Sequence, residues 1–290
     1  MRLRTAIFGV LLFLQSALVV TGGAVRLTGS GLGCPTWPEC TPGSYTPVPY
    51  QAEGQLHAWI EFGNRLLTFA LLFSALVAVI YVLQSGRKDL RSLAAGQVLG
   101  ILGQGVLGGI TVLTDLHPLP VAGHLLLSML LIAGATSLYS RRHEPHAKVP
   151  AATKTISLVS QAHIAISFVV LILGTVVTGS GPHAGDEKAQ RFDLDIRSVA
   201  ILHADAVIFL MGITIALLVA ASVTKSTKKA IYIFFAISLA QGGVGYAQYL
   251  TGIPEILVAI HLAGATIFWI AAWRIRLSVV RTSQQERDQP

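Results

Sequence analysis

Long apolar segments recur along the whole chain and constrain its fold more than any other feature. Eight of them are long enough to cross a bilayer as helices, at about residues 6–27, 56–83, 93–114, 119–140, 156–178, 199–222, 230–250 and 255–276. A helix of about 20 residues is about 30 Å long, which matches the hydrocarbon core of a membrane. Only 12% of the 290 residues are charged, roughly half the share in a soluble domain. The pattern predicts an all-α integral membrane protein with eight transmembrane helices.

Basic residues cluster at alternate ends of these segments. They occupy both termini and every second connection: Arg2/Arg4, Arg87/Lys88/Arg91, Arg141/Arg142/Lys148/Lys154, Lys225/Lys228/Lys229 and Arg274/Arg276/Arg281/Arg287. Short loops rich in Lys and Arg stay on the cytoplasmic side, so we expect both termini in the cytoplasm and the chain in the cell membrane. The first segment resembles a signal sequence, but it is long enough to span and lacks a good cleavage site, so we expect a retained helix. The net charge of +7 is an orientation signal, and no nucleic-acid partner is expected.

An internal duplication links residues 104–125 with residues 241–262 without gaps. The matching pairs are Gln104/Gln241, Gly105/Gly242, Gly108/Gly245, Leu113/Leu250, Thr114/Thr251, Val121/Val258, Ala122/Ala259 and His124/His261. Leu, Val and Ala often match by chance in apolar helices, but Gln, Thr and His in register do not. We therefore predict two tandem four-helix bundles related by a parallel repeat, residues 1–145 and 146–276, and a polar cytoplasmic tail at 277–290.

Five histidines lie within the predicted spans or at their edges: His57, His124, His163, His203 and His261. A single histidine in a helix is usually a packing residue, although ionisable groups in membranes often have a function. His203 and His261 lie near the outer ends of two helices that both begin outside, so they share one depth. Two imidazoles at one depth on facing helices favour a bis-histidine haem. Zinc is less favoured, because no third or fourth ligand accompanies them.

The first half has a different residue at the corresponding place. His203 precedes His261 by 58 residues, whereas Asn64 precedes His124 by 60 residues, so the repeat places Asn64 opposite His124. His57 lies two turns further out on nearly the same helix face. The second half therefore suits a haem whose iron has two histidine ligands. The first half suits an iron with an open or displaceable coordination position, as catalysis requires.

Charged residues flank these histidines. Glu61 and Arg65 are spaced to form an ion pair within one helix, or Glu61 acts as an acid/base or substrate-orienting group beside His124. Arg26 and Arg65 are also candidates to pair with haem propionates, because arginine binds carboxylates with two parallel hydrogen bonds.

The two cysteines, Cys34 and Cys40, lie in the first outward connection. A structural disulfide is permitted on the outer face of a membrane. A redox-active or haem-handling pair is the alternative, and the spacing does not separate the two.

Taken together, these motifs resemble the bacterial haem A synthase family from the first segment to the last. The resemblance rests on residues 28–40 (TGSGLGCPTWPEC), 60–65 (IEFGNR), 104–112 (QGVLGGITV), 177–186 (VTGSGPHAGD) and 249–255 (YLTGIPE), followed by His261.

The resemblance implies an oxidoreductase that converts haem O to haem A by successive oxidation of a porphyrin methyl group to a formyl group. It implies a haem B held by His203 and His261, a substrate-haem site with His124 as a ligand, and Glu61 as a catalytic residue. The Cys34/Cys40 pair matches the outward cysteine pair of the family.

Two departures from the family pattern matter. The family commonly has a histidine where this chain has Asn64, so either His57 replaces that ligand or the substrate iron is ligated on one side only. A second cysteine pair, present in some members between the fifth and sixth helices, is absent from this sequence.

Two non-catalytic functions remain as alternatives, a bis-histidine haem electron carrier and a haem transporter or chaperone. For the enzyme, the expected partners are haem O, membrane lipid, an electron donor such as quinol, the farnesyltransferase that makes haem O, and further copies of the chain. Redox cofactor chemistry must carry the reaction, because acid/base groups alone do not oxidise such a C–H bond.

Overall fold

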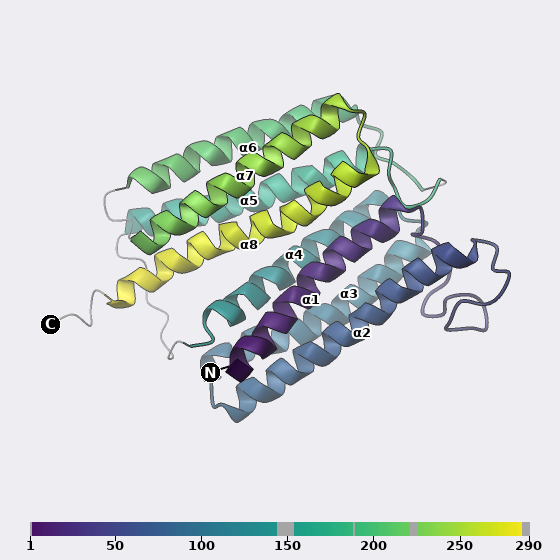
Figure 1. Cartoon of the computed structure of the whole chain (residues 1–290), viewed down its shortest axis with the longest axis horizontal. Coiled ribbons are helices and arrows are strands. Elements are labelled where there is room, and N and C mark those ends of the chain that lie inside the picture. Colours follow the sequence, from purple (N-terminus) through teal and green to yellow (C-terminus); the bar gives the residue numbers. More distant parts are fainter. Residues whose placement is uncertain (1, 144–153, 188, 221–224, 286–290) are drawn as a thin grey trace. The chain divides into compact units, whose positions relative to one another are not determined.

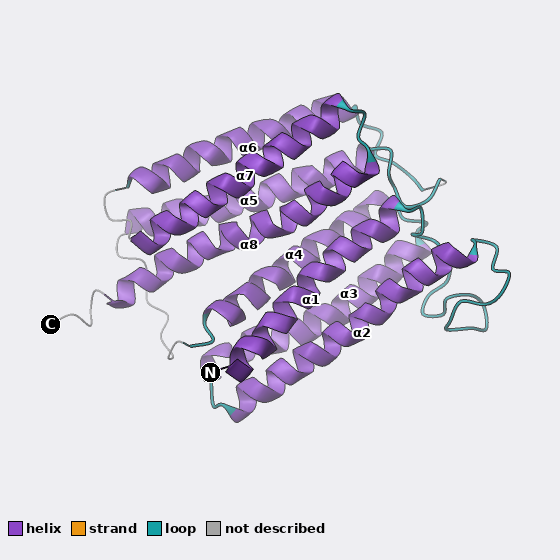
Figure 2. Cartoon of the chain, in the orientation of Figure 1, coloured by secondary structure: helices purple, strands orange, loops and turns teal. Residues whose placement is uncertain are grey.

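The computed structural model describes residues 2–143, 154–187, 189–220 and 225–285. These residues form eight α-helices joined by loops (Figures 1 and 2). The helices are α1 (Arg2–Leu27), α2 (Gln55–Gln84), α3 (Arg91–Leu113), α4 (Pro118–Ser140), α5 (Lys154–Ser180), α6 (Ile196–Val219), α7 (Lys225–Leu250) and α8 (Glu255–Gln285), with a short 3-10 helix, η1 (Lys88–Leu90), before α3. The described residues contain no β-strand beyond one isolated bridge between Thr41 and Ser44. The all-α prediction is confirmed.

Every predicted apolar segment coincides with one of these helices. Each of the eight is long and apolar enough to cross a membrane, so the chain is a multi-pass membrane protein. The helices extend past the apolar segments into polar sequence. The largest extension is in α8, which continues through Gln285, where a polar tail was expected from residue 277.

The chain divides into two compact units. One comprises Met1–Arg142 and Thr175–Ile196, and the other comprises His143–Gly174 and Arg197–Pro290. The C-terminal end of α5 and the loop that follows it therefore belong with α1–α4. The predicted division at residue 145 and the parallel repeat stay predictions.

In the first unit, α1 packs against α2 and α4, and α3 packs against α2 and α4 (Figure 1). The core between these helices is apolar and includes Phe8, Leu11, Leu71, Ile101 and Leu138. One polar chain crosses it: Gln15 donates to Gln97 (2.9 Å), and Gln97 donates to the carbonyl of Leu131 (3.0 Å). Both glutamines are buried, so these bonds join α1, α3 and α4 inside the apolar region.

Basic residues gather at one end of the first unit, as the charge pattern predicts. Asp89 pairs with Arg87 (2.8 Å) and with Arg141 (3.0 Å). Arg4 donates to the carbonyl of Arg142 (3.4 Å). The start of α1, the α2–α3 turn and the end of α4 thus lie together.

The opposite end of the first unit is covered by residues 175–196. Arg26 donates to the carbonyls of His183 and Thr178, and the amide of Gly31 donates to the carbonyl of Gly185 (2.9 Å). An apolar cluster of Leu116, Ala184 and Ala189 closes this cap.

The second unit is held by aromatic contacts along α5, α7 and α8. Phe234 of α7 contacts Phe268 of α8 (5.0 Å between ring centroids) and the buried His163 of α5 (4.8 Å). In the C-terminal half of α8, Arg276 donates to Ser160 of α5 (2.8 Å). These contacts place α5 beside both α7 and α8.

Candidate functional site: histidines that rest on glycines

Two histidines of the second unit lie on different helices. His203 is on α6 and His261 is on α8, and the two imidazoles are close enough to interact electrostatically. Both side chains are half-buried. The Nδ1 atom of each is buried and makes no hydrogen bond within the described residues.

Each of these rings lies against a glycine of a neighbouring helix. A Cβ atom at Gly245 of α7 would lie 3.3 Å from Cε1 of His261, and one at Gly174 of α5 would lie 3.4 Å from Cε1 of His203. The backbone of His261 is also held, because the Gln241 amide of α7 donates to its carbonyl (2.8 Å). Position and ring orientation are therefore both constrained at His261.

His124 of the first unit has the same surroundings. A Cβ atom at Gly108 of α3 would lie 3.3 Å from its Cε1, and the Gln104 amide donates to its carbonyl (3.0 Å). Gln104 also donates to Ser128 (2.6 Å). The Nδ1 atom of His124 is again buried without a hydrogen bond in the described part of the chain.

These donors fit haem better than a zinc ion. Within the described residues, no group of three or more His, Cys, Asp or Glu side chains is placed to hold a metal ion. Structural zinc takes four such ligands and catalytic zinc three, whereas haem iron takes only one or two from the protein. Buried imidazoles on separate helices of a bundle, with unpartnered nitrogens, match the haem requirement.

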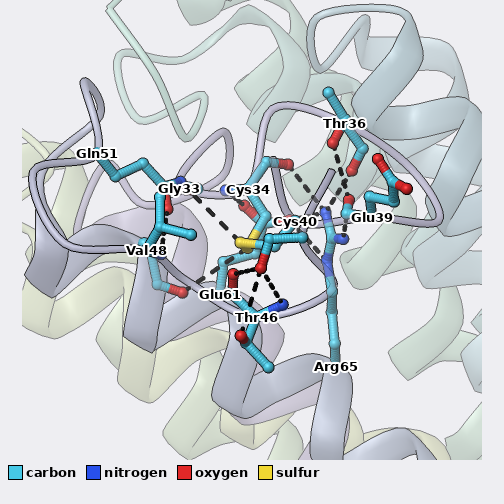
Figure 3. Close-up of a disulfide and its surroundings, with 12 residues drawn as sticks. Gly33, Cys34, Thr36, Glu39, Cys40, Thr46, Val48, Gln51, Glu61 and Arg65 are labelled. Carbon is cyan, nitrogen blue, oxygen red and sulfur yellow. Dashed lines mark hydrogen bonds and ion pairs between the residues drawn. A yellow bond between two sulfur atoms is a disulfide. The ribbon is translucent and has the colours of Figure 1, made fainter. Parts of the chain in front are cut away.

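Glu61 and Arg65 of α2 clamp the first outward loop (Figure 3). Arg65 pairs with Oε1 of Glu61 (2.6 Å), while Oε2 of Glu61 accepts from the backbone amide of Cys34 (2.6 Å). Arg65 also donates to the carbonyls of Cys34 (2.9 Å) and Glu39 (3.1 Å). The ion-pair interpretation of Glu61 is confirmed, and its catalytic role stays a prediction.

Cys34 and Cys40 form a disulfide within this loop, and both are fully buried (Figure 3). Gln51 donates to the carbonyl of Gly33, which ties the far end of the loop to the disulfide region. Gly33 lies so close to the first turn of α2 that a side chain there would collide with the His57 carbonyl.

The two candidate ligands on α2 both have polar partners. The Nδ1 atom of His57 bonds Ser30 (2.9 Å), a fully buried residue of the same loop. Asn64 accepts through Oδ1 from Thr21 of α1 (2.7 Å). No hydrogen bond or ion pair joins Glu61 to His124 among the described residues.

The two arginines considered for propionate binding are already engaged by the protein. Arg65 uses Nε, Nη1 and Nη2 for Glu61 and the loop carbonyls, and Arg26 uses Nε and Nη2 for the carbonyls of residues 178 and 183. Their visible function is to hold the outer loops on the helix ends.

Several residues of this region carried no recognisable signal in the sequence. Ser30 and Gln51 are ordinary loop residues whose contacts depend on how the loop folds back. His117 caps α4 by accepting from the amide of Leu119 (3.3 Å), ahead of the prolines at its first turn. Gln104 and Gln241 stood out as repeat partners, and that recurrence was the one signal of their role.

The known proteins that this chain resembles belong to one family. The sequence model of the COX15-CtaA family, described as "Cytochrome oxidase assembly protein", matches residues 5–185. A heme A synthase of Sinorhizobium fredii is 24% identical over 91% of this chain and 87% of its own length. A heme A synthase of Rhizobium johnstonii is 25% identical over 92% of this chain and 88% of its own length. One of Geobacillus thermodenitrificans is 31% identical, over 40% of this chain and 35% of its own length.

Proposed function

Since this chain belongs to the COX15-CtaA family of cytochrome oxidase assembly proteins, we propose that it acts as a haem A synthase. This activity is that of a membrane oxidoreductase, which converts haem O to haem A by oxidising a porphyrin methyl group to a formyl group. Relatives named heme A synthase match more than nine-tenths of the chain, which supports the assignment.

One observation in the structure carries the proposal. His203 on α6 and His261 on α8 are close enough to interact electrostatically, and each has a buried Nδ1 that lacks a hydrogen bond in the described region. We propose that they are the two axial ligands of a haem B. That group, when bound, supplies the redox chemistry that protein side chains lack.

In the first unit, His124 is the proposed ligand of the substrate haem. It is the repeat counterpart of His261 and has the same Gln and Gly contacts. His57 is the proposed second group on α2, because Asn64 is occupied by Thr21. If the Nδ1–H of His57 donates to Ser30, the Nε2 lone pair of His57 is free for iron.

Glu61, Arg65 and the disulfide contribute to the substrate site by holding the loop between α1 and α2 in place. Their hydrogen bonds fix the loop of Cys34 and Cys40 on the outer end of α2, beside His57. We propose that this loop covers the substrate haem and limits water. Glu61 is in addition the proposed acid/base residue, as the family resemblance implies.

The remaining parts of the proposal concern the cell. Oxidation of the methyl group to a formyl group removes four electrons and adds one oxygen atom, so the reaction needs an external oxidant. With molecular oxygen as that oxidant, successive hydroxylations also need an electron donor, for which a quinol is the proposed class. Haem O is supplied by the farnesyltransferase that makes it. We place the chain in the cell membrane with both termini in the cytoplasm, which the positions of its basic clusters support.

The test is expression in a host that makes haem O but lacks its own haem A synthase. Extracted haems are separated by chromatography. We expect haem A, or its hydroxylated precursor, from the natural chain and neither from His124→Ala, while His124→Ala keeps haem B. Haem B alone from the natural chain would instead identify an electron carrier, and unchanged haem O bound to the purified protein would identify a transporter or chaperone.

A further inference from the structure

Two of the proposed ligand histidines, His261 and His124, are each contacted by a glutamine and a glycine of one neighbouring helix. Gln241 and Gly245 of α7 contact the carbonyl and the ring of His261. Gln104 and Gly108 of α3 contact the carbonyl and the ring of His124. Residues four apart lie on the same helix face, one turn from each other, so each pair can hold one histidine at two points.

From this geometry, and resting on the proposed function, we infer that Gln241/Gly245 and Gln104/Gly108 are positioning residues that orient His261 and His124 toward haem iron. We call each pair a histidine seat. The glutamine holds the backbone carbonyl of the histidine, and the glycine leaves room for the Cε1 edge of the imidazole to approach the neighbouring helix.

The glycine contact is tight enough to set the ring orientation. A methyl group 3.3 Å from Cε1 is closer than an ordinary van der Waals contact, so the imidazole would have to shift by a few tenths of an ångström. Iron ligation depends on ring orientation, and groups that orient a metal-bound histidine are nearly as important as the ligand itself.

The glutamine contact is a hydrogen bond between helices in an apolar environment. The His261 carbonyl accepts from Gln241 at 2.8 Å, and the His124 carbonyl accepts from Gln104 at 3.0 Å. Such bonds between membrane helices fix their relative register. A change at either glutamine therefore moves the ligand without removing it.

His203 provides an internal comparison. Its ring rests on Gly174, and the residue four positions earlier on α5 is Val170, whose backbone interacts with the ring as the backbone of Gln241 does with His261, but which has no side-chain amide to hold the His203 carbonyl. His203 thus has the glycine contact without the glutamine. The two seats also differ, since Gln104 donates in addition to Ser128, where the second unit has Ala265.

The chain contains matched controls for the glycine contacts. Gly243 of α7 and Gly105 of α3 have nothing within 4 Å of a Cβ position. Alanine at these positions changes helix propensity as it does at Gly245 and Gly108, without touching a histidine.

The test uses the full-length protein purified with its haem B. For Gly245→Ala and Gln241→Met, we expect altered g values of the low-spin haem signal and a haem B affinity lower by about tenfold. For Gly243→Ala we expect the natural spectrum and affinity. Equal spectra and affinities for Gly245→Ala and Gly243→Ala would overturn the inference.

A second experiment uses variants of the first unit. Because haem B is proposed to bind in the second unit, an unchanged haem B spectrum shows that a variant is still folded. Gly108→Ala and Gln104→Met should lower haem A production by about tenfold while leaving the haem B spectrum unchanged, and Gly105→Ala should change neither. Haem A production by Gly108→Ala equal to that of Gly105→Ala would contradict the inference.

The two hypotheses fail in different ways. A natural protein without a bis-histidine haem signal would overturn the proposed function and, with it, the seats. A natural protein with that signal, whose Gly245 and Gln241 variants are indistinguishable from it, would overturn the seats alone.

Discussion

At the scale of single residues, the outer end of α2 is organised by one ion pair. Glu61 is 6% exposed, and both of its oxygens are used, one by Arg65 and one by the Cys34 amide. Arg65 in turn holds three loop carbonyls. The buried carboxylate therefore depends on a single cation, Arg65 of α2, which also holds the loop.

Replacement of Arg65 tests that dependence. Arg65→Met leaves the Glu61 carboxylate buried without its cation, which costs roughly 3 kcal/mol or more. We expect a lower thermal unfolding midpoint for the protein in detergent. The double variant Glu61→Gln/Arg65→Met removes both charges and should be more stable than Arg65→Met. A double variant that is no more stable would show that the pair contributes little.

At the scale of helices, the first unit is joined by small residues and by a few polar bonds. Gln97 of α3 bridges Gln15 of α1 and the backbone of α4, and it fits only because residue 134 is glycine. A Cβ atom at Gly134 would lie 2.6 Å from the Gln97 amide nitrogen. Close approach of helices at small residues is how membrane helices pack without a hydrophobic driving force between them.

A double-mutant cycle measures this bridge. Gln97→Leu removes both bonds and leaves the Gln15 amide buried without its acceptor, at a cost of roughly 1–2 kcal/mol. In Gln15→Leu/Gln97→Leu, the destabilisation should be smaller than the sum of the two single effects, because one shared bond is lost in each. Additive effects on the unfolding free energy in detergent would mean that the glutamines are not coupled.

At the scale of the whole molecule, the eight helices long enough to span a membrane are an even number, from which we expect both chain ends on one side of it. In the first unit, Arg4, Arg87 and Arg141 meet at one end, and the disulfide loop and residues 175–196 cover the other. The basic end is expected in the cytoplasm. The disulfide then faces the oxidising side, where such bonds persist.

Labelling of intact cells tests this orientation on the full chain. Leu194→Cys, at a half-exposed position in the α5–α6 loop, should react with a membrane-impermeant maleimide added outside. Ser85→Cys, at the exposed end of α2, should react only after the cells are permeabilised. The opposite labelling pattern would invert the proposed topology.

The helices, and the residues that serve as candidate haem ligands, could be predicted from local patterns. Hydropathy along the chain marked all eight spans, and the recurrence of Gln, Gly and His in register singled out His124 and His261. These properties are readable in order along the chain, because a membrane helix satisfies its own backbone and needs no distant partner to form.

Contacts between distant segments were decided only by the tertiary structure. Glu61 meets Cys34, His57 meets Ser30, and Arg26 meets the carbonyls of residues 178 and 183 because loops fold back onto helix ends. Arg26 and Arg65 were candidates to pair with haem propionates, which stays a prediction; in the structure their donors bond backbone carbonyls and, for Arg65, the Glu61 carboxylate as well. A hydrogen bond depends on distance and angle in space, so the partner of a polar side chain is settled only when the surrounding segments have packed.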